Sequence, residues 1–284
     1  MIDVQFLIAF FLYSINLVFL SLGLVLIFNV SKVVNLAHGS FYVLGGYLAS
    51  VLVLRTNSLW GVALAAAAAV PLGLLIAYVS RRLRRDVEQI FFTFSLSLLF
   101  EGLFKAAFGV GNYTAGDFAR SLGGFSLGGT EVPASYLLGF AVLAASLGAF
   151  SAFLYKTRYG LFIRAVVDDA EMAQALGVRA GPVFYAAGVI GAAFAVLGGA
   201  VASLWLAYSL GMAANLLVYA FAVMVISGTA NIWGVVPASV LASFVRTLSV
   251  YYFPEFELFS LYAIVVLVLL LKPEGLFVRH VRVV

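Results

Sequence analysis

The sequence contains no cysteine, and only 10% of its 284 residues are charged. The missing thiols exclude disulfide bonds and thiolate metal sites. The shortage of charge excludes an ordinary soluble domain, because 64% of the residues are hydrophobic. The net charge of +4 is small and gives no reason to expect nucleic-acid binding. The composition therefore indicates a protein that lies largely within a membrane.

Motifs for nucleotide binding and metal catalysis are also missing. The sequence has no G-x4-GK[ST] phosphate-binding loop and no H-E-x-x-H metal motif. Its two histidines, His38 and His280, stand too far apart to indicate a metal site. We therefore expect a chain that is not an enzyme and that holds no metal or cofactor.

Long apolar runs are what the sequence does contain. A membrane-spanning helix needs roughly 20 apolar residues, and the chain has room for about eight or nine. We predict an all-α, polytopic transmembrane helical bundle that forms one membrane domain over residues 1–284. Two of the segments, about 34–54 and 216–228, are weak enough that at least one is expected to be broken or re-entrant. The predicted segments lie at about 4–28, 34–54, 59–79, 89–109, 134–155, 183–208, 216–228, 233–252 and 257–271.

Clusters of lysine and arginine predict which loops face the cytoplasm. Basic residues gather in 81–85, in 156–179 and in the tail 272–282, and even numbers of predicted spans separate these regions. All three can therefore be cytoplasmic, which places the N-terminus and the stretch 110–133 outside. That stretch is rich in Gly, Ser and Thr and predicts an ordered loop with a short hairpin. The N-terminus lacks a charged n-region and a cleavage site, so we expect the first segment to remain as a span.

Small residues at every fourth position predict close helix packing in two segments. One ridge is Ala187, Gly191, Ala195, Gly199 and Ser203, and a second is Ala65, Ala69, Gly73 and Ala77. We assign these ridges to structure and give them no chemistry.

The polar stretch at about 156–182 interrupts the apolar pattern and predicts a short, capped helix. Asp168 is a good N-cap, Glu171 completes a capping box three residues later, and Gly177 suits the position after the C-cap. One small apolar face is expected to consist of Met172, Ala173 and Leu176. Such a face could dock on a partner, or the helix could be an ordinary amphipathic connector. Glu171-Met172-Ala173, followed after three residues by Gly177, resembles the EAA-x3-G cytoplasmic loop of ABC-importer permeases.

A second polar group opens a predicted membrane segment. Asn35 and His38 are three residues apart and would share a helical face, and polar groups at membrane depth usually face the protein interior or a water-filled path. Gly39, Gly45 and Gly46 allow another backbone or a ligand to come near. These residues could line a translocation path from a broken helix. Alternatively, Asn35 and His38 could form hydrogen bonds that hold the bundle together.

Four runs in order resemble a known family, the branched-chain amino-acid ABC transporter permeases, in their first permease type. Residues 35–39 resemble the family's N-[FLM]-A-H-G segment, and 157–165 resemble its T-R-x-G-x-x-x-R-A lead into the coupling loop. Residues 169–177 resemble its D-x-E-x-A-x-x-x-G pattern, and 272–277 its closing R-P-x-G-L-F. The glycine-rich stretch of the family stands here as 227–234, with Ser227 and Ala230 in place of glycines and Asn231 in place of a small hydroxyl residue.

The resemblance implies the permease subunit of an ATP-driven importer in a cell (inner) membrane, with a cytoplasmic C-terminus. It implies two cytoplasmic ABC ATPase subunits that carry ATP and Mg, a second related permease and an external solute-binding protein. ATPase coupling would fall to the stretch around Asp168, Asp169, Glu171, Met172, Ala173, Leu176 and Gly177. The translocation path would include Asn35, His38, Gly39, Gly45, Gly46, Gly228 and Asn231. The implied cargo is a branched-chain or other hydrophobic amino acid, and urea, short amides or other amino acids remain alternatives.

Arg246 lies within a predicted span and needs a partner, a water-filled cavity or a nearby interface. We expect an ion pair with Glu255 or Glu257, and a contact with a substrate carboxylate is the alternative. Glu101 and Lys105 are four residues apart and predict a helical ion pair. A self-sufficient channel or secondary carrier is the competing function, and it would need ionisable residues at mid-membrane.

Overall fold

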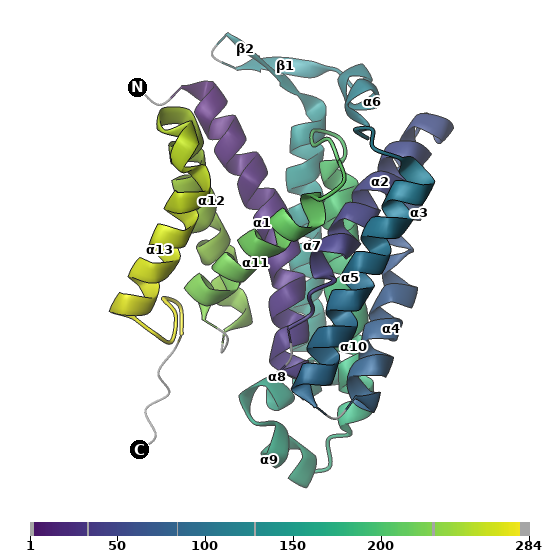
Figure 1. The fold of residues 1–284 in the computed structure, drawn as a ribbon, viewed down its shortest axis with the longest axis vertical. Coiled ribbons are helices and arrows are strands. Elements are labelled where there is room, and N and C mark those ends of the chain that lie inside the picture. The colour runs from purple at the N-terminus through teal and green to yellow at the C-terminus, as the bar shows by residue number, and fades with distance from the viewer. Residues whose placement is uncertain (1–2, 33, 84, 128, 229–230, 279–284) are drawn as a thin grey trace.

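The computed structural model describes residues 3–32, 34–83, 85–127, 129–228 and 231–278, and helices make up nearly all of its regular structure (Figure 1). The all-α prediction is therefore confirmed. The long helices are α1 (Val4–Ser31), α2 (His38–Thr56), α4 (Ala69–Arg82), α5 (Asp86–Phe108), α7 (Ala134–Lys156), α10 (Ala180–Ala202), α11 (Met212–Ser227), α12 (Val235–Tyr252) and α13 (Glu257–Leu271). Shorter helices are α3 (Trp60–Ala66), α6 (Gly116–Ser121), α8 (Arg158–Asp168), α9 (Ala170–Ala175), η1 (Ile232–Gly234) and η2 (Pro254–Phe256).

Seven helical segments of the described residues are candidate membrane spans by length and composition. Two shorter apolar helices, Met212–Ser227 and Phe259–Leu271, accompany them. Each predicted apolar segment contains one of these helices, so the chain is a multi-pass membrane protein. The segment predicted at 59–79 is divided between α3 and α4. Pro71 explains this break, because it has no N–H for the carbonyl of Ala67 and its ring clashes with that group.

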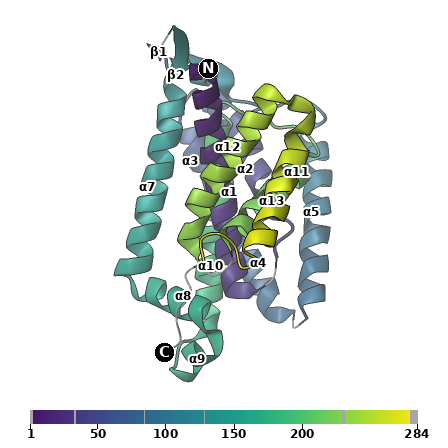
Figure 2. The ribbon, with the colours of Figure 1, turned by 90° about the vertical axis from the view of Figure 1, so that its left-hand side faces the viewer.

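The two ends of the bundle carry different structures (Figures 1 and 2). The start of α1, helix α6 and an antiparallel hairpin of β1 (Gly124–Leu127) and β2 (Thr130–Pro133) lie at one end. Helices α8 and α9 lie at the opposite end. The hairpin confirms the prediction for 110–133, and α6 is an addition to it. The relative sides of the hairpin and of the 156–182 loop are those that the basic clusters predict.

Helix α10 lies at the centre of the bundle against α1, α2 and α4. Its predicted small-residue ridge is buried, and it allows close backbone contact. A methyl group on Gly191 would meet Ile27 and the Gly23 carbonyl of α1, and one on Gly199 would meet the Tyr42 carbonyl of α2. The second ridge, on α3 and α4, faces α10 in the same way, since Gly73 lies against Val189. Both packing predictions are confirmed.

Helices α2 and α11 both begin inside the bundle. Residues 34–37 are not helical, and the His38 ring at the start of α2 lies 2.9 Å from the carbonyl of Leu20, near the middle of α1. After α10, residues 203–211 turn back into the bundle before α11 starts. Tyr208 in this return segment exchanges two backbone hydrogen bonds with Tyr113 of the hairpin-side loop, at 2.8 and 2.9 Å. The expectation of at least one broken or re-entrant segment is confirmed, because the chain enters the bundle twice without helix.

Candidate functional site

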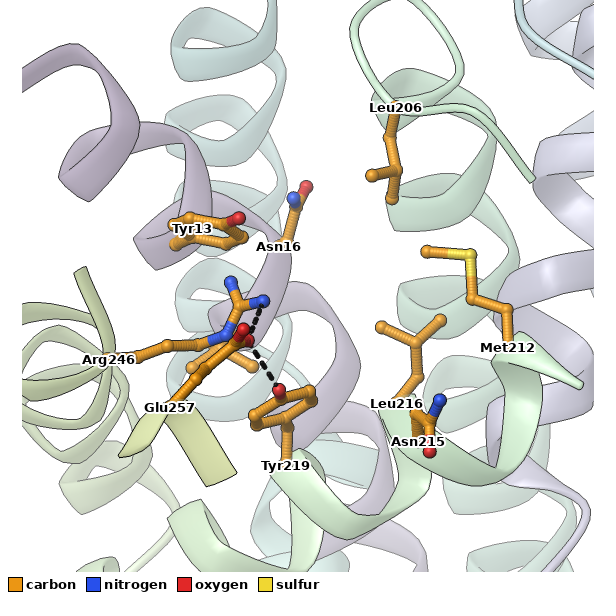
Figure 3. Close-up of a pocket in the computed structure, with 10 residues that line it drawn as sticks. Tyr13, Asn16, Leu206, Met212, Asn215, Leu216, Tyr219, Arg246 and Glu257 are labelled. Carbon is orange, nitrogen blue, oxygen red and sulfur yellow. Dashed lines mark hydrogen bonds and ion pairs between the residues drawn. The ribbon is translucent and has the colours of Figure 1, made fainter. Parts of the chain in front are cut away.

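A cavity of about 350 Å³ lies between α1, α11, α12 and α13, and it is the candidate site (Figure 3). Three of the helices that border it were notable in the sequence. Helix α11 corresponds to the short apolar segment at 216–228, and α12 and α13 carry Arg246 and Glu257. The start of α11 forms one wall, so the cavity is positioned by the chain's return into the bundle. Its lining residues are Tyr13, Asn16, Leu17, Leu206, Met212, Asn215, Leu216, Tyr219, Arg246 and Glu257.

One end of the cavity carries a pair of opposite charges. A guanidinium nitrogen of Arg246 on α12 lies 2.5 Å from the carboxylate Oε1 of Glu257 on α13, and the two side chains are only 14% and 31% exposed. The hydroxyl of Tyr219 donates a hydrogen bond of 2.9 Å to the same Oε1. The rings of Tyr13 and Tyr219 lie 3.8 and 4.8 Å from the guanidinium carbon. Cation–π contacts with these rings hold the guanidinium at the cavity. Without them the long side chain would extend toward the lipid headgroups.

The other end of the cavity is mainly apolar, and Asn215 is its polar residue. Figure 3 shows Leu206, Met212 and Leu216 grouped on the side opposite the charged pair. Asn16 lies between the two ends, and its Oδ1 accepts a 3.1 Å hydrogen bond from the Tyr42 hydroxyl. Asn16 is thus a polar residue of the cavity lining that a hydrogen bond to α2 holds in place. The site therefore offers charge at one end and hydrocarbon at the other.

The ion-pair predictions from the sequence have different outcomes. Arg246 pairs with Glu257, which confirms the first interpretation of this residue. The predicted pair of Glu101 with Lys105 is wrong. The Glu101 carboxylate instead accepts a 2.6 Å hydrogen bond from the backbone N–H of Gly211, the N-cap of α11. The exposed N–H groups at a helix start attract a carboxylate more strongly than a lysine on the same surface does.

Asn35 and His38, which the sequence assigned to the path, are buried in the bundle and do not line the cavity. The Asn35 side chain accepts a 3.1 Å hydrogen bond from the backbone N–H of Ala37, and His38 bonds the Leu20 carbonyl. These contacts hold the non-helical entry into α2. They are the bundle-fixing contacts of the alternative interpretation.

The glycines after His38 let helices approach closely. A methyl group on Gly39 would meet the Ala213 carbonyl of α11, and one on Gly45 would meet the backbone of Val196 on α10. A methyl group on Gly46 would meet the ring of Tyr208. None of the three lines the cavity. Their contacts are those of packing, at the place where the two inward-starting helices meet.

Gly228 and Asn231 also lie away from the cavity. Gly228, at φ +76°, packs against the backbone of Glu274 and Gly275, where Gly275 itself has φ +99°. Asn231 donates a 3.0 Å hydrogen bond to the Phe277 carbonyl and caps η1. The closing segment 272–277 is therefore held against the end of α11. The adjoining positions 229 and 230, and the tail after 278 with His280, lie outside the described residues.

The 156–182 loop contains two helices where the sequence predicted one. Thr157 caps α8 by accepting a 3.0 Å hydrogen bond from the N–H of Gly160. The cap assigned to Asp168 is wrong by one residue, because Asp168 ends α8 and Asp169 caps α9. The Asp169 carboxylate accepts from the N–H groups of Glu171 and Met172 at 3.0 and 2.9 Å. Two helices that adjoin at this point require the extended residue Asp169 between them.

The end of α9 is as predicted. Gly177 has φ +89°, its N–H bonds the Gln174 carbonyl, and the N–H of Val178 bonds the Ala173 carbonyl. This pair of bonds is a Schellman motif. The predicted apolar face is corrected at Ala173, which is buried against the bundle. Met172 and Leu176 remain exposed, at 58% and 79%.

The sequence profile of a family described as "Branched-chain amino acid transport system / permease component" matches residues 6–271. The chain belongs to this family. It is a permease component of a transport system. The helices described above extend over nearly all of the matched residues. Comparison with curated proteins and with solved structures gave no significant match.

Several residues of the permease's cavity were missed at the sequence level. Tyr13, Asn16, Asn215 and Tyr219 lie in apolar segments far apart in the chain, and only the fold brings them together. The two asparagines were the available signal, because an amide within an apolar span must be paired or face a cavity. The residues predicted for the translocation path do not line this cavity, and their assignment to that path stays a prediction.

Proposed function

We propose that this permease is the membrane subunit of an ATP-driven ABC importer for branched-chain or other hydrophobic amino acids. The family match supports transport of this class of cargo. The exposed helix α9 is the structural observation that carries the coupling role. It is capped at both ends, it lies beyond the bundle at one end, and it presents Met172 and Leu176 to the surroundings.

In this proposal ATP is hydrolysed by two cytoplasmic partner ATPases, and this chain holds no nucleotide, metal or cofactor. The caps make α9 a rigid unit, and α8 and the buried Ala173 connect it to the bundle. Closure of the ATPase pair would move α9 and so change the bundle. A second related permease and an external solute-binding protein complete the complex. The 156–182 loop and the C-terminus would face the cytoplasm of a cell (inner) membrane.

Affinity purification in mild detergent from native membranes tests this proposal. We expect two P-loop ATPases and a sister permease to co-purify with the chain. Replacing both Met172 and Leu176 by Asp should remove the ATPases, because carboxylates cannot be desolvated in an apolar cleft. The sister permease should remain, and a Gln174→Asp variant, exposed on the same helix, serves as the matched control. A solitary chain that still transports after reconstitution would contradict the importer and favour a channel or carrier.

A further inference from the structure

We propose that the cavity at the start of α11 binds the zwitterionic head group of one α-amino acid. Arg246 would take the carboxylate, Glu257 the ammonium, and the apolar end the side chain. This inference rests on the proposed function and narrows its cargo. It favours α-amino acids over urea and short amides, the alternatives that the sequence left open.

The charged pair is placed for a ligand more than for stability. A buried ion pair contributes little net stability, because desolvation offsets the attraction between its charges. Arg246 and Glu257 also belong to consecutive helices that the short η2 turn already joins. Arg246 lies within the candidate membrane span Ile232–Tyr252, where an ionisable residue is costly, and Glu257 begins α13 after the turn that follows this span. Both charged side chains line the cavity together with Tyr13 and Tyr219, so a ligand that enters the cavity meets both charges.

Charge balance selects the kind of ligand. The Arg246–Glu257 pair is neutral as a whole, and a zwitterion is neutral too, so the cavity stays neutral when the ligand enters. The ligand's carboxylate and ammonium can extend the existing pair into an alternating row of four charges. A ligand with a single net charge would leave one charge uncompensated in a low-dielectric site, which is strongly unfavourable.

Free hydrogen-bonding capacity supports the same assignment. Arg246 and Tyr219 both use the Oε1 oxygen of Glu257, and a carboxylate has a second oxygen that can accept from an ammonium. The guanidinium has five N–H donors in a fork that matches a carboxylate. Tyr219 can turn its hydroxyl between the two charges. Asn16 adds a polar side chain to the lining between the charged and apolar ends.

The size and shape of the cavity agree with one amino acid. About 350 Å³ is at the lower end of the range for small-molecule sites. Leu206, Met212 and Leu216 lie across from the charged pair, where an aliphatic side chain would point (Figure 3). Urea has neither the charges for one end nor the hydrocarbon for the other. The described residues at the apolar end carry no charge for a basic or acidic side chain.

Other cavities of the described chain do not combine these features. One of about 350 Å³ on the hairpin side contains Asp117 and Arg120, but that pair is largely exposed to solvent. A groove between α7 and α10, also about 350 Å³, is lined almost entirely by apolar residues such as Phe150 and Phe194. Unlike these two, the cavity at α11 places a mostly buried pair of opposite charges across from a mainly apolar wall.

Calorimetric titration of the purified full-length chain in lipid nanodiscs tests the inference. The ligands are L-leucine, L-isoleucine and L-valine, with L-leucinamide and 4-methylpentanoate as analogues that keep one charge each, and with urea and acetamide. We expect at least one of the three amino acids to bind, and the leucine analogues to bind at least about tenfold more weakly than leucine. Urea and acetamide should give no binding. Equal affinity for leucine and both analogues, or no binding of any amino acid, would overturn the inference.

A variant pair gives a second readout. Glu257→Gln should weaken leucine binding by at least about tenfold and close the gap between leucine and 4-methylpentanoate, because the ammonium loses its partner. Glu255→Gln, an exposed acid two residues away, should change neither. A purely structural pair would lower all affinities together. Co-purification of the ATPases is independent of these titrations, so the importer can stand where the zwitterion site fails.

Discussion

Near the centre of this permease, the backbone of a facing helix leaves room only for glycine at several positions. Gly45 and Gly199 bring α2 and α10 together, and Gly23 and Gly191 do the same for α1 and α10. At each of these contacts a carbonyl of the opposite helix lies where a methyl group would be. A methyl group on Gly148 of α7, by contrast, would meet no atom of the described residues within 4 Å. The number of glycines alone therefore does not predict helix packing. Whether a glycine is needed depends on the helix that faces it.

Gly45→Ala should destabilise the folded permease by about 1–3 kcal/mol, because the new methyl group would overlap the backbone of Val196. Thermal unfolding in detergent should show the loss as a lower midpoint. Gly148→Ala is the matched control, since it also lies within a helix but faces open space, and helix propensity favours alanine there. Equal midpoints for the two variants would show that α2 and α10 do not pack as described.

At the scale of the element, α9 is short and depends on its ends. Six residues form little more than one turn and would not be stable as an isolated helix. The Asp169 cap, the Schellman motif at Gly177 and the buried Ala173 hold it in place. A short segment fixed at three points can move as a rigid body, which is what force transmission to the bundle requires.

Asp169→Ala should loosen the first turn of α9 at a cost of about 0.5–2 kcal/mol, because two backbone N–H groups lose their acceptor. Hydrogen–deuterium exchange should become faster at Glu171 and Met172. Asp168→Ala removes the same carboxylate one residue earlier and should leave the exchange of α9 unchanged. If instead Asp168→Ala gives the faster exchange, the cap assignment is wrong.

At the scale of the whole molecule, the permease has two distinct ends and two helices, α2 and α11, that start inside the bundle, and α11 forms one wall of the cavity. Helix α2 starts near the middle of α1, and α11 starts after the chain returns from the hairpin side. Gly39 and Ala213 place these two starts against each other.

The cysteine-free sequence makes the membrane topology directly testable. Ser126→Cys on β1 should react with a membrane-impermeant thiol reagent added to intact cells, because the hairpin is predicted to face outward. Gln174→Cys on α9 should react only after the membrane is opened, since both positions are exposed but lie at opposite ends. The unmodified chain provides the zero-label background. Reversed labelling would contradict the orientation derived from the basic loops.

The amino-acid sequence alone was sufficient for the positions of the nine apolar segments, the packing ridges, the hairpin region and the family. These features depend on local hydrophobicity, spacing and turn chemistry, which are written in neighbouring residues. The break at Pro71 could have been derived in the same way and was missed. The cap at Asp169 was assigned one residue early, because two adjoining carboxylates offer the same chemistry and only the end of α8 distinguishes them.

Tertiary structure decided the cavity and which residues line it. Tyr13 and Asn16 belong to α1, far in the chain from Tyr219, Arg246 and Glu257 on the successive helices α11, α12 and α13, and no local pattern relates the two groups. The same holds for Glu101, whose partner is a backbone N–H more than a hundred residues away and not the lysine one turn along. Long-range contacts depend on how the helices pack, and packing is a property of all their surfaces at once. The sequence could therefore predict the permease, and the folded chain was needed to find its cavity.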